Sequence, residues 1–210
     1  MEFITPIFKW IHIIAGVLWI GLLYFFNWIN GHVAATMDGD TKKKVVPELM
    51  PRALYFFRWG AAWTWVTGMV LLLLVYWMQM NDSMFRELGI GEEASKFKHV
   101  AYLIPFIMVF VYDAFYKSSL AKNTRVATIT SFMGIAGVLC LLICVSQMTS
   151  YRAYNIHLGT MFGSMMAFNV WYRIWPAQQR IITAIKNGDA PNPADAGMAG
   201  LRSKHNTYMS

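Results

Sequence analysis

Three of the five histidines stand in or beside long apolar stretches, where ionisable side chains are rare and usually functional. His12 lies about two helical turns into the first stretch, His157 about one turn into the last, and His99 opens the third. Imidazole nitrogens are axial ligands of haem iron, and two imidazoles on facing helices can hold a porphyrin between them. The pattern therefore predicts haem b, provided that helices bring these residues to one level.

Small residues accompany the histidines. Gly16 lies one helical turn after His12 on the same face, and Gly159 and Gly163 fall close to His157. Such residues let a flat macrocycle or a neighbouring helix approach closely. The same spacing also serves ordinary helix packing, and a boundary histidine can simply hydrogen-bond water. A structural role for these positions therefore stays open.

Zinc is the rival metal at these histidines. Zinc sites usually need three or four ligands, often with carboxylate or thiolate help. No acidic residue lies in the apolar stretches near His12 or His157, which favours haem. His32 and His205 occur in loop-like sequence toward the opposite face, where we expect a solvated role.

The elements that must position these residues are membrane helices. Hydrophobic residues make up 57% of the 210 and charged residues 14%, against roughly 45–50% and 25% in soluble domains. Five stretches reach the roughly 20 residues that span a bilayer, and each should be a helix because lipid cannot satisfy exposed backbone groups. They are 4–30, 53–79, 98–117, 126–148 and 153–175. The sequence predicts an all-α membrane bundle over 1–180 and a C-terminal tail over 181–210.

The basic residues predict an orientation for this bundle. Of the 18 lysines and arginines, 13 fall within 31–58, 117–125 and 173–204, which five spans place on the side opposite the N-terminus. By the positive-inside rule that side is cytoplasmic, so the tail is cytoplasmic and the N-terminus periplasmic, in a bacterial inner membrane. His12, His99 and His157 then share a depth near the periplasmic face. The same excess of lysine and arginine on one side of the membrane explains the net charge of +7 without nucleic-acid binding.

Further polar side chains interrupt the apolar stretches. Asp113, Lys117 and Arg58 lie at similar predicted depths, which predicts a buried ion pair or triad, with a proton or quinone-headgroup role as the alternative. Cys140 and Cys144 lie one turn apart in the fourth stretch and are expected to be small buried residues.

Several motifs along the chain resemble one protein family. They are Trp10-Ile-His12-Ile-Ile-Ala-Gly16-Val-Leu-Trp19-Ile-Gly21; Val111-Tyr112-Asp113 with Lys117-Ser118; His157-Leu-Gly159; Asn169-Val170-Trp171 with Pro176 and Gln179-Arg180; Lys186-x-Gly188-x-x-Pro191-x-Pro193; and Arg202-Ser203-x-His205-Asn206-x-Tyr208. In order and spacing they resemble the urate oxidase N-terminal family, the membrane domain of bacterial urate hydroxylases. The first motif is also similar to several bacterial haem-handling membrane families.

The resemblance implies membrane-bound oxidation of urate, with electrons passing to a c-type cytochrome that full members carry at their C-terminus. Two departures stand out. The sequence given ends at Ser210, where members continue with further helices, so we expect a truncated form without the cytochrome domain. In addition, Gly60 follows Arg58-Trp59 where members often carry an acidic residue.

Together these observations predict a membrane-embedded redox subunit. It would bind haem b through His12, His157 or His99, beside Gly16, and exchange electrons with a c-type cytochrome or other subunits of a respiratory complex; quinol is one candidate donor. Two alternatives stay open, which are a self-contained urate-oxidising domain and a cofactor-free structural or assembly subunit.

Overall fold

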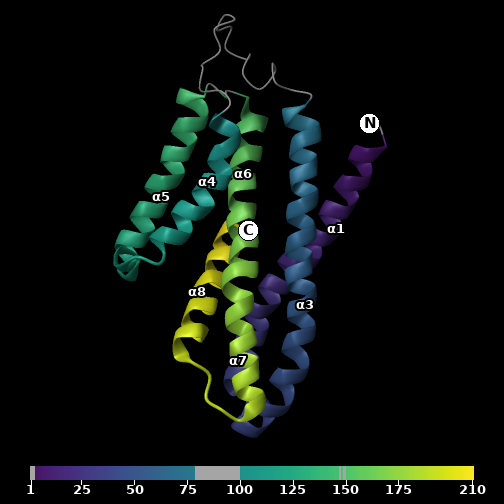
Figure 1. Ribbon diagram of the computed structural model, residues 1–210, viewed down its shortest axis with the longest axis vertical. Coiled ribbons are helices and arrows are strands. Elements are labelled where there is room, and N and C mark those ends of the chain that lie inside the picture. Colours follow the sequence, from purple (N-terminus) through teal and green to yellow (C-terminus); the bar gives the residue numbers. More distant parts are fainter. Residues whose placement is uncertain (1–2, 79–99, 147, 149) are drawn as a thin grey trace, which may run out of the picture. The chain divides into compact units, whose positions relative to one another are not determined.

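The computed structural model describes residues 3–78, 100–146, 148 and 150–210, and within these ranges the chain is helical, with no strand. The predicted all-α class is thus confirmed. In chain order the elements are α1 (Ile4–Tyr24), η1 (Phe25–Asn30), α2 (Gly31–Thr36), α3 (Gly39–Leu72), η2 (Leu73–Trp77), α4 (Val100–Phe115), η3 (Ser119–Lys122), α5 (Thr124–Cys140), η4 (Leu141–Val145), α6 (Tyr151–Phe168), η5 (Asn169–Ile174), α7 (Trp175–Asn187) and α8 (Pro193–Met209) (Figure 1). Apart from the short 3₁₀ turn η3, the η segments are wide π turns within longer helices.

Three helical stretches are long and apolar enough to cross a bilayer, which indicates a membrane protein. They are Ile4–Thr36, Gly39–Trp77 and Thr124–Val145, and a shorter apolar helix covers Tyr102–Phe115. The count of five spans and the orientation of the bundle stay predictions.

The polar segment between the first two spans is helical rather than a loop. Only Met37 and Asp38 separate α2 from α3, which begins well before the predicted span and contains Pro47 and Pro51. The Asp38 carboxylate accepts the backbone N–H of Thr41 at 2.9 Å and its hydroxyl at 2.7 Å, as a helix N-cap does. The N–H bond from Thr41 is also the main cause of a lowered pKa for Asp38. Local capping therefore starts α3 early.

The chain divides into two compact units, Met1–Met69 with Met166–Ser210, and Val70–Met165, and each is described by itself. In the first unit α1, α3 and the end of α6 with η5 share a core. Its buried members are Trp19, Leu23, Met50, Leu54, Phe57, Ala61, Met166, Val170 and Ile174. A Cβ at Gly60 would lie 3.3 Å from the Cβ and backbone N of Trp19, so glycine at this position permits the close contact of α1 with α3.

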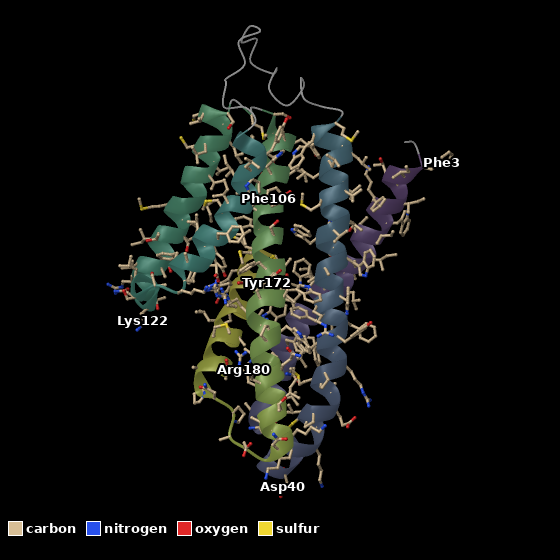
Figure 2. All side chains as sticks on the ribbon, in the orientation of Figure 1. Phe3, Asp40, Phe106, Lys122, Tyr172 and Arg180 are labelled. Carbon is tan, nitrogen blue, oxygen red and sulfur yellow. The ribbon has the colours of Figure 1, made fainter. Side chains whose placement is uncertain are left out.

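The C-terminal residues form an ordered helical hairpin in the first unit. Helix α7 ends at Gly188, whose φ of 84° is the left-handed conformation that favours glycine, and the Asn192 side chain caps α8. Arg180, labelled in Figure 2, donates two hydrogen bonds of 2.9 and 2.6 Å to Asp195. Helix α8 thereby returns beside α7 (Figure 1). The predicted tail is therefore packed helix, and its side of the membrane stays a prediction.

In the second unit α4 and α5 are consecutive helices linked by the η3 turn. The hydroxyls of Tyr116 and Ser131 share a 2.9 Å hydrogen bond, and Lys117 pairs with Asp113 at 2.8 Å, which confirms the ion pair expected there. Cys140 and Cys144 are free and exposed, so the expectation that they are buried was wrong. The reason is that α5 buries few side chains, Ala127 and Val138.

Candidate functional site

His12 projects from α1 onto α3 within the first unit. Its Nδ1 lies 2.9 Å from the carbonyl oxygen of Thr64 and 3.2 Å from Oγ1 of Thr67. A carbonyl can only accept, so Nδ1 carries the hydrogen of the neutral ring and Nε2 carries a lone pair. The Thr67 hydroxyl donates to the Trp63 carbonyl at 2.6 Å, which leaves its oxygen able to accept from His12.

Nε2 of His12 has no hydrogen-bond partner among the described residues. A ring held by a backbone carbonyl through one nitrogen, with the other nitrogen open, is the usual arrangement of a metal-ligating histidine. The side chain is half-buried, and its neighbours Ile11, Ile13 and Ile14 are exposed on an apolar helix. His12 therefore fits the requirements of an axial haem ligand.

Gly68 contacts His12, whereas Gly16 faces Thr64, and the two glycines leave different amounts of space. A Cβ at Gly68 would lie 3.0 Å from Cε1 and 3.4 Å from Nδ1 of His12, so the imidazole occupies the space that Gly68 leaves open. A Cβ at Gly16, by contrast, would meet Thr64 at 3.8 Å, an ordinary contact. Gly16 thus lies where α1 faces α3. Gly68, which the sequence did not single out, leaves the space that the His12 imidazole occupies.

Gly68→Ala is expected to destabilise the protein by about 1–3 kcal/mol, because the new methyl group meets a ring that cannot retreat without losing its bond to Thr64. Gly16→Ala is the matched control and should change stability by less than about 1 kcal/mol. Thermal unfolding of both variants in detergent measures the difference. Equal stability of the two variants would contradict the tight fit at Gly68.

His157 on α6 is fully buried in the second unit, and both of its ring nitrogens are engaged. Nδ1–H donates to the carbonyl of Ala153 at 2.8 Å, and Nε2 accepts the indole N–H of Trp77 at 3.2 Å. The tautomer is therefore the same as that of His12, with the Nε2 lone pair already used. His157 could ligate a metal only after the Trp77 indole turned away.

Aromatic rings surround His157. The ring of Tyr102 lies 6.0 Å from the imidazole and that of Tyr76 lies 6.4 Å from it, edge to face. Arg152 donates from Nε to the Tyr76 hydroxyl at 2.9 Å. Phe106 on α4, labelled in Figure 2, lies 6.5 Å from Trp77. Nothing in the sequence indicated that the indole N–H of Trp77 would contact His157.

His99 is the remaining predicted ligand, and His32 was expected to be solvated. His99 lies outside the described residues, and His32 is exposed on α2. Among residues 3–78, 100–146, 148 and 150–210, no three His, Cys, Asp or Glu side chains come together as a metal site. The described residues thus offer no zinc-type cluster, whereas a haem needs only one or two axial ligands from the protein.

His205 on α8 lies close to Arg202. Burial and the positive charge of Arg202 lower the pKa of His205 from the ordinary 6.5 to about 4. This histidine is therefore neutral at physiological pH, in part-buried surroundings rather than in the solvated loop that the sequence predicted.

Acidification should lower the stability of the protein because His205 on α8 becomes protonated. Its pKa in the folded chain is below 6.5, so the unfolded chain takes up a proton first as the pH falls. The contribution of neutral His205 to the free energy of unfolding is complete above pH 6.5 and is lost as the pH falls toward 4. We expect about 1 kcal/mol less stability at pH 5 than at pH 7, after allowance for solvent screening. Thermal unfolding should show this loss in the wild type, and His205→Gln should reduce it; an unchanged pH profile in the variant would contradict it.

A buried amide pair joins α8 to η5. Nδ2 of Asn169 donates to Oδ1 of Asn206 at 2.9 Å, and Nδ2 of Asn206 donates to the Met166 carbonyl at 3.1 Å. Arg202 lies 3.5 Å from the Asn169 amide oxygen. All three polar side chains are almost fully buried. The motifs around Asn169 and Asn206, far apart in the sequence, therefore meet in the structure.

Comparison with known protein families shows to which family the chain belongs. A sequence model described as urate oxidase N-terminal matches residues 37–210. The chain belongs to the urate oxidase N-terminal family. Among curated proteins and solved structures, no match was found.

The matched range of the urate oxidase N-terminal family contains His157, Asn169 and Asn206, and it contains Gly68 on α3. His12 precedes residue 37 and lies outside it. The family assignment, with three helices able to cross a bilayer, indicates a membrane protein related to urate hydroxylase. It names no cofactor, so the role of His12 depends on its geometry.

Proposed function

We propose that this member of the urate oxidase N-terminal family is a membrane-embedded redox subunit that binds haem b through Nε2 of His12. The observation that carries the proposal is the His12 geometry, with Nδ1–H fixed on the Thr64 carbonyl and Nε2 open. Haem b, when bound, would supply one-electron transfer. The chain would exchange electrons with a c-type cytochrome or another redox subunit of a bacterial inner-membrane complex.

The protein groups have defined roles in this proposal. Thr64 orients the imidazole and fixes its tautomer, because its carbonyl accepts the Nδ1 hydrogen. Gly68 leaves the space in which the ring sits. His157, in the other compact unit, stays a predicted ligand from the sequence, and Trp77 would have to release its Nε2 before it could bind a metal.

The first test uses the wild-type protein purified in mild detergent from its native membrane. Reduced-minus-oxidised spectra and a pyridine haemochrome assay should show a b-type haem. Quinol and urate are then compared as electron donors, with cytochrome c as acceptor. A colourless wild-type protein would overturn the proposal.

Two other functions have an observation in their favour. Family membership favours a urate-oxidising domain, which requires urate-dependent reduction of cytochrome c by this chain. The fully satisfied His157 favours a structural or assembly subunit, because its hydrogen bonds link α6 to η2 without a cofactor. A structural subunit would be colourless, and its His12 would tolerate alanine.

A further inference from the structure

Arg58 lies on α3 after the start of the apolar part of this helix, and its guanidinium group is surrounded by aromatic rings. Its Cζ lies 3.9 Å from the centroid of the Trp175 ring, 5.6 Å from that of Tyr55 and 5.9 Å from that of Trp171. The indole N–H of Trp171 donates to the Arg58 carbonyl at 3.0 Å, which ties η5 to this turn of α3. The cation is therefore held in place by stacking and packing.

No acceptor in the described part of the chain satisfies this cation. Nε of Arg58 is buried without a hydrogen-bond partner, and no carboxylate of the described residues forms an ion pair with Arg58. Of the three residues in the predicted triad, Lys117 and Asp113 form an ion pair in the second unit, and Arg58 lies in the first unit. A cation in an apolar helix is costly unless an anion accompanies it, and cation–π contacts offset only part of that cost.

The surroundings of Arg58 resemble the headgroup level of a membrane protein. Tyr55 and Trp59 are 50% and 41% exposed, and Phe56 beside them is 55% exposed. Trp59 lies edge to face with Trp171 at 5.5 Å. Tryptophan and tyrosine gather where acyl chains meet headgroups, and exposed apolar rings there contact lipid rather than water.

We propose that Arg58, with Trp175, Trp171 and Tyr55, forms a binding site for the phosphodiester of an anionic phospholipid. The guanidinium group would donate charge-assisted hydrogen bonds to the phosphate oxygens. The exposed rings of Tyr55, Phe56 and Trp59 would contact the glycerol and the upper acyl chains. A basic group between membrane helices is a known form of lipid headgroup site. The proposal is independent of haem.

Arg52 provides a matched control on the same helix. It pairs with Glu48 at 2.8 Å, and its side chain is 78% exposed, so it already has an anion. Within the described residues Arg52 makes no cation–π contact. Wild type, Arg58→Gln and Arg52→Gln would be titrated in detergent with phosphatidylglycerol and, separately, with phosphatidylcholine of the same chains. Native mass spectrometry counts the lipid bound.

We expect one saturable phosphatidylglycerol site in the wild type, at least tenfold weaker in Arg58→Gln and within twofold of wild type in Arg52→Gln. Arg58→Lys and Trp175→Leu, expected to bind with intermediate affinity, test the site if Arg58→Gln fails to fold. Binding that is equal in Arg58→Gln and wild type would overturn the proposal. Displacement of the lipid by equimolar glycerol 3-phosphate would also overturn it, since the site would then recognise a soluble anion.

Discussion

A His12→Ala variant is expected to lose the b-type haem of the wild-type protein. Alanine removes the open Nε2 lone pair and leaves the Thr64 carbonyl without its side-chain donor. The fully buried His157 already accepts a hydrogen bond from Trp77, so it cannot replace His12 without rearrangement. Haem per protein, measured by pyridine haemochrome, should fall at least tenfold, because even the loss of a group that only orients a metal ligand lowers metal affinity by about 10–100-fold.

His32→Ala is the matched control, because His32 is exposed on α2 and should leave the haem content unchanged. His157→Ala tests the separate prediction that His157 ligates haem. Loss of a haem ligand would shift the reduced spectrum, whereas a purely structural His157 would lower stability and leave the band in place. A His12→Ala protein that keeps its full haem content would refute the assignment of His12.

The sequence predicted the parts of this structure that depend on local pattern. Long apolar runs indicated helices, because a polar backbone in lipid has few other solutions, and the described residues are all helix or short connection. The i,i+4 pair of Asp113 and Lys117 was found for the same reason, since one helical turn fixes the contact.

The parts that depend on tertiary packing could not be predicted in this way. Trp77 reaches His157 across 80 positions, and Asn169 reaches Asn206 across 37. No periodic spacing of residue types along the sequence predicts such distant pairs. The early start of α3 was missed because the apolar stretch begins only at residue 53, whereas capping by Asp38 decides where the helix begins. The resemblance to a family did mark Asn169 and Asn206, although it gave no contact between them.

Asn206→Leu should be among the most destabilising single changes in the C-terminal region. Asn206 is 0% exposed, and its amide satisfies both Asn169 and the Met166 carbonyl. Leucine keeps the branching at Cγ but leaves a buried donor on Asn169 and a buried carbonyl without this partner, each costing about 1–3 kcal/mol. We expect a loss of about 2–4 kcal/mol, measured by unfolding in detergent. Asn187→Ala, at an exposed position, should change stability by less than about 0.5 kcal/mol.

The cost of Asn206→Leu should also depend on Asn169, because the two amides satisfy each other. In a double-mutant cycle with Asn169→Leu, the second substitution should cost less than it does alone, by about 1 kcal/mol or more, because the hydrogen bond between the two amides is already lost. Proteolysis of α8 should increase in the single variants, because this pair joins α8 to η5. Additive costs would mean that the amides act separately and that α8 is held mainly by its other contacts, such as Asp195 with Arg180.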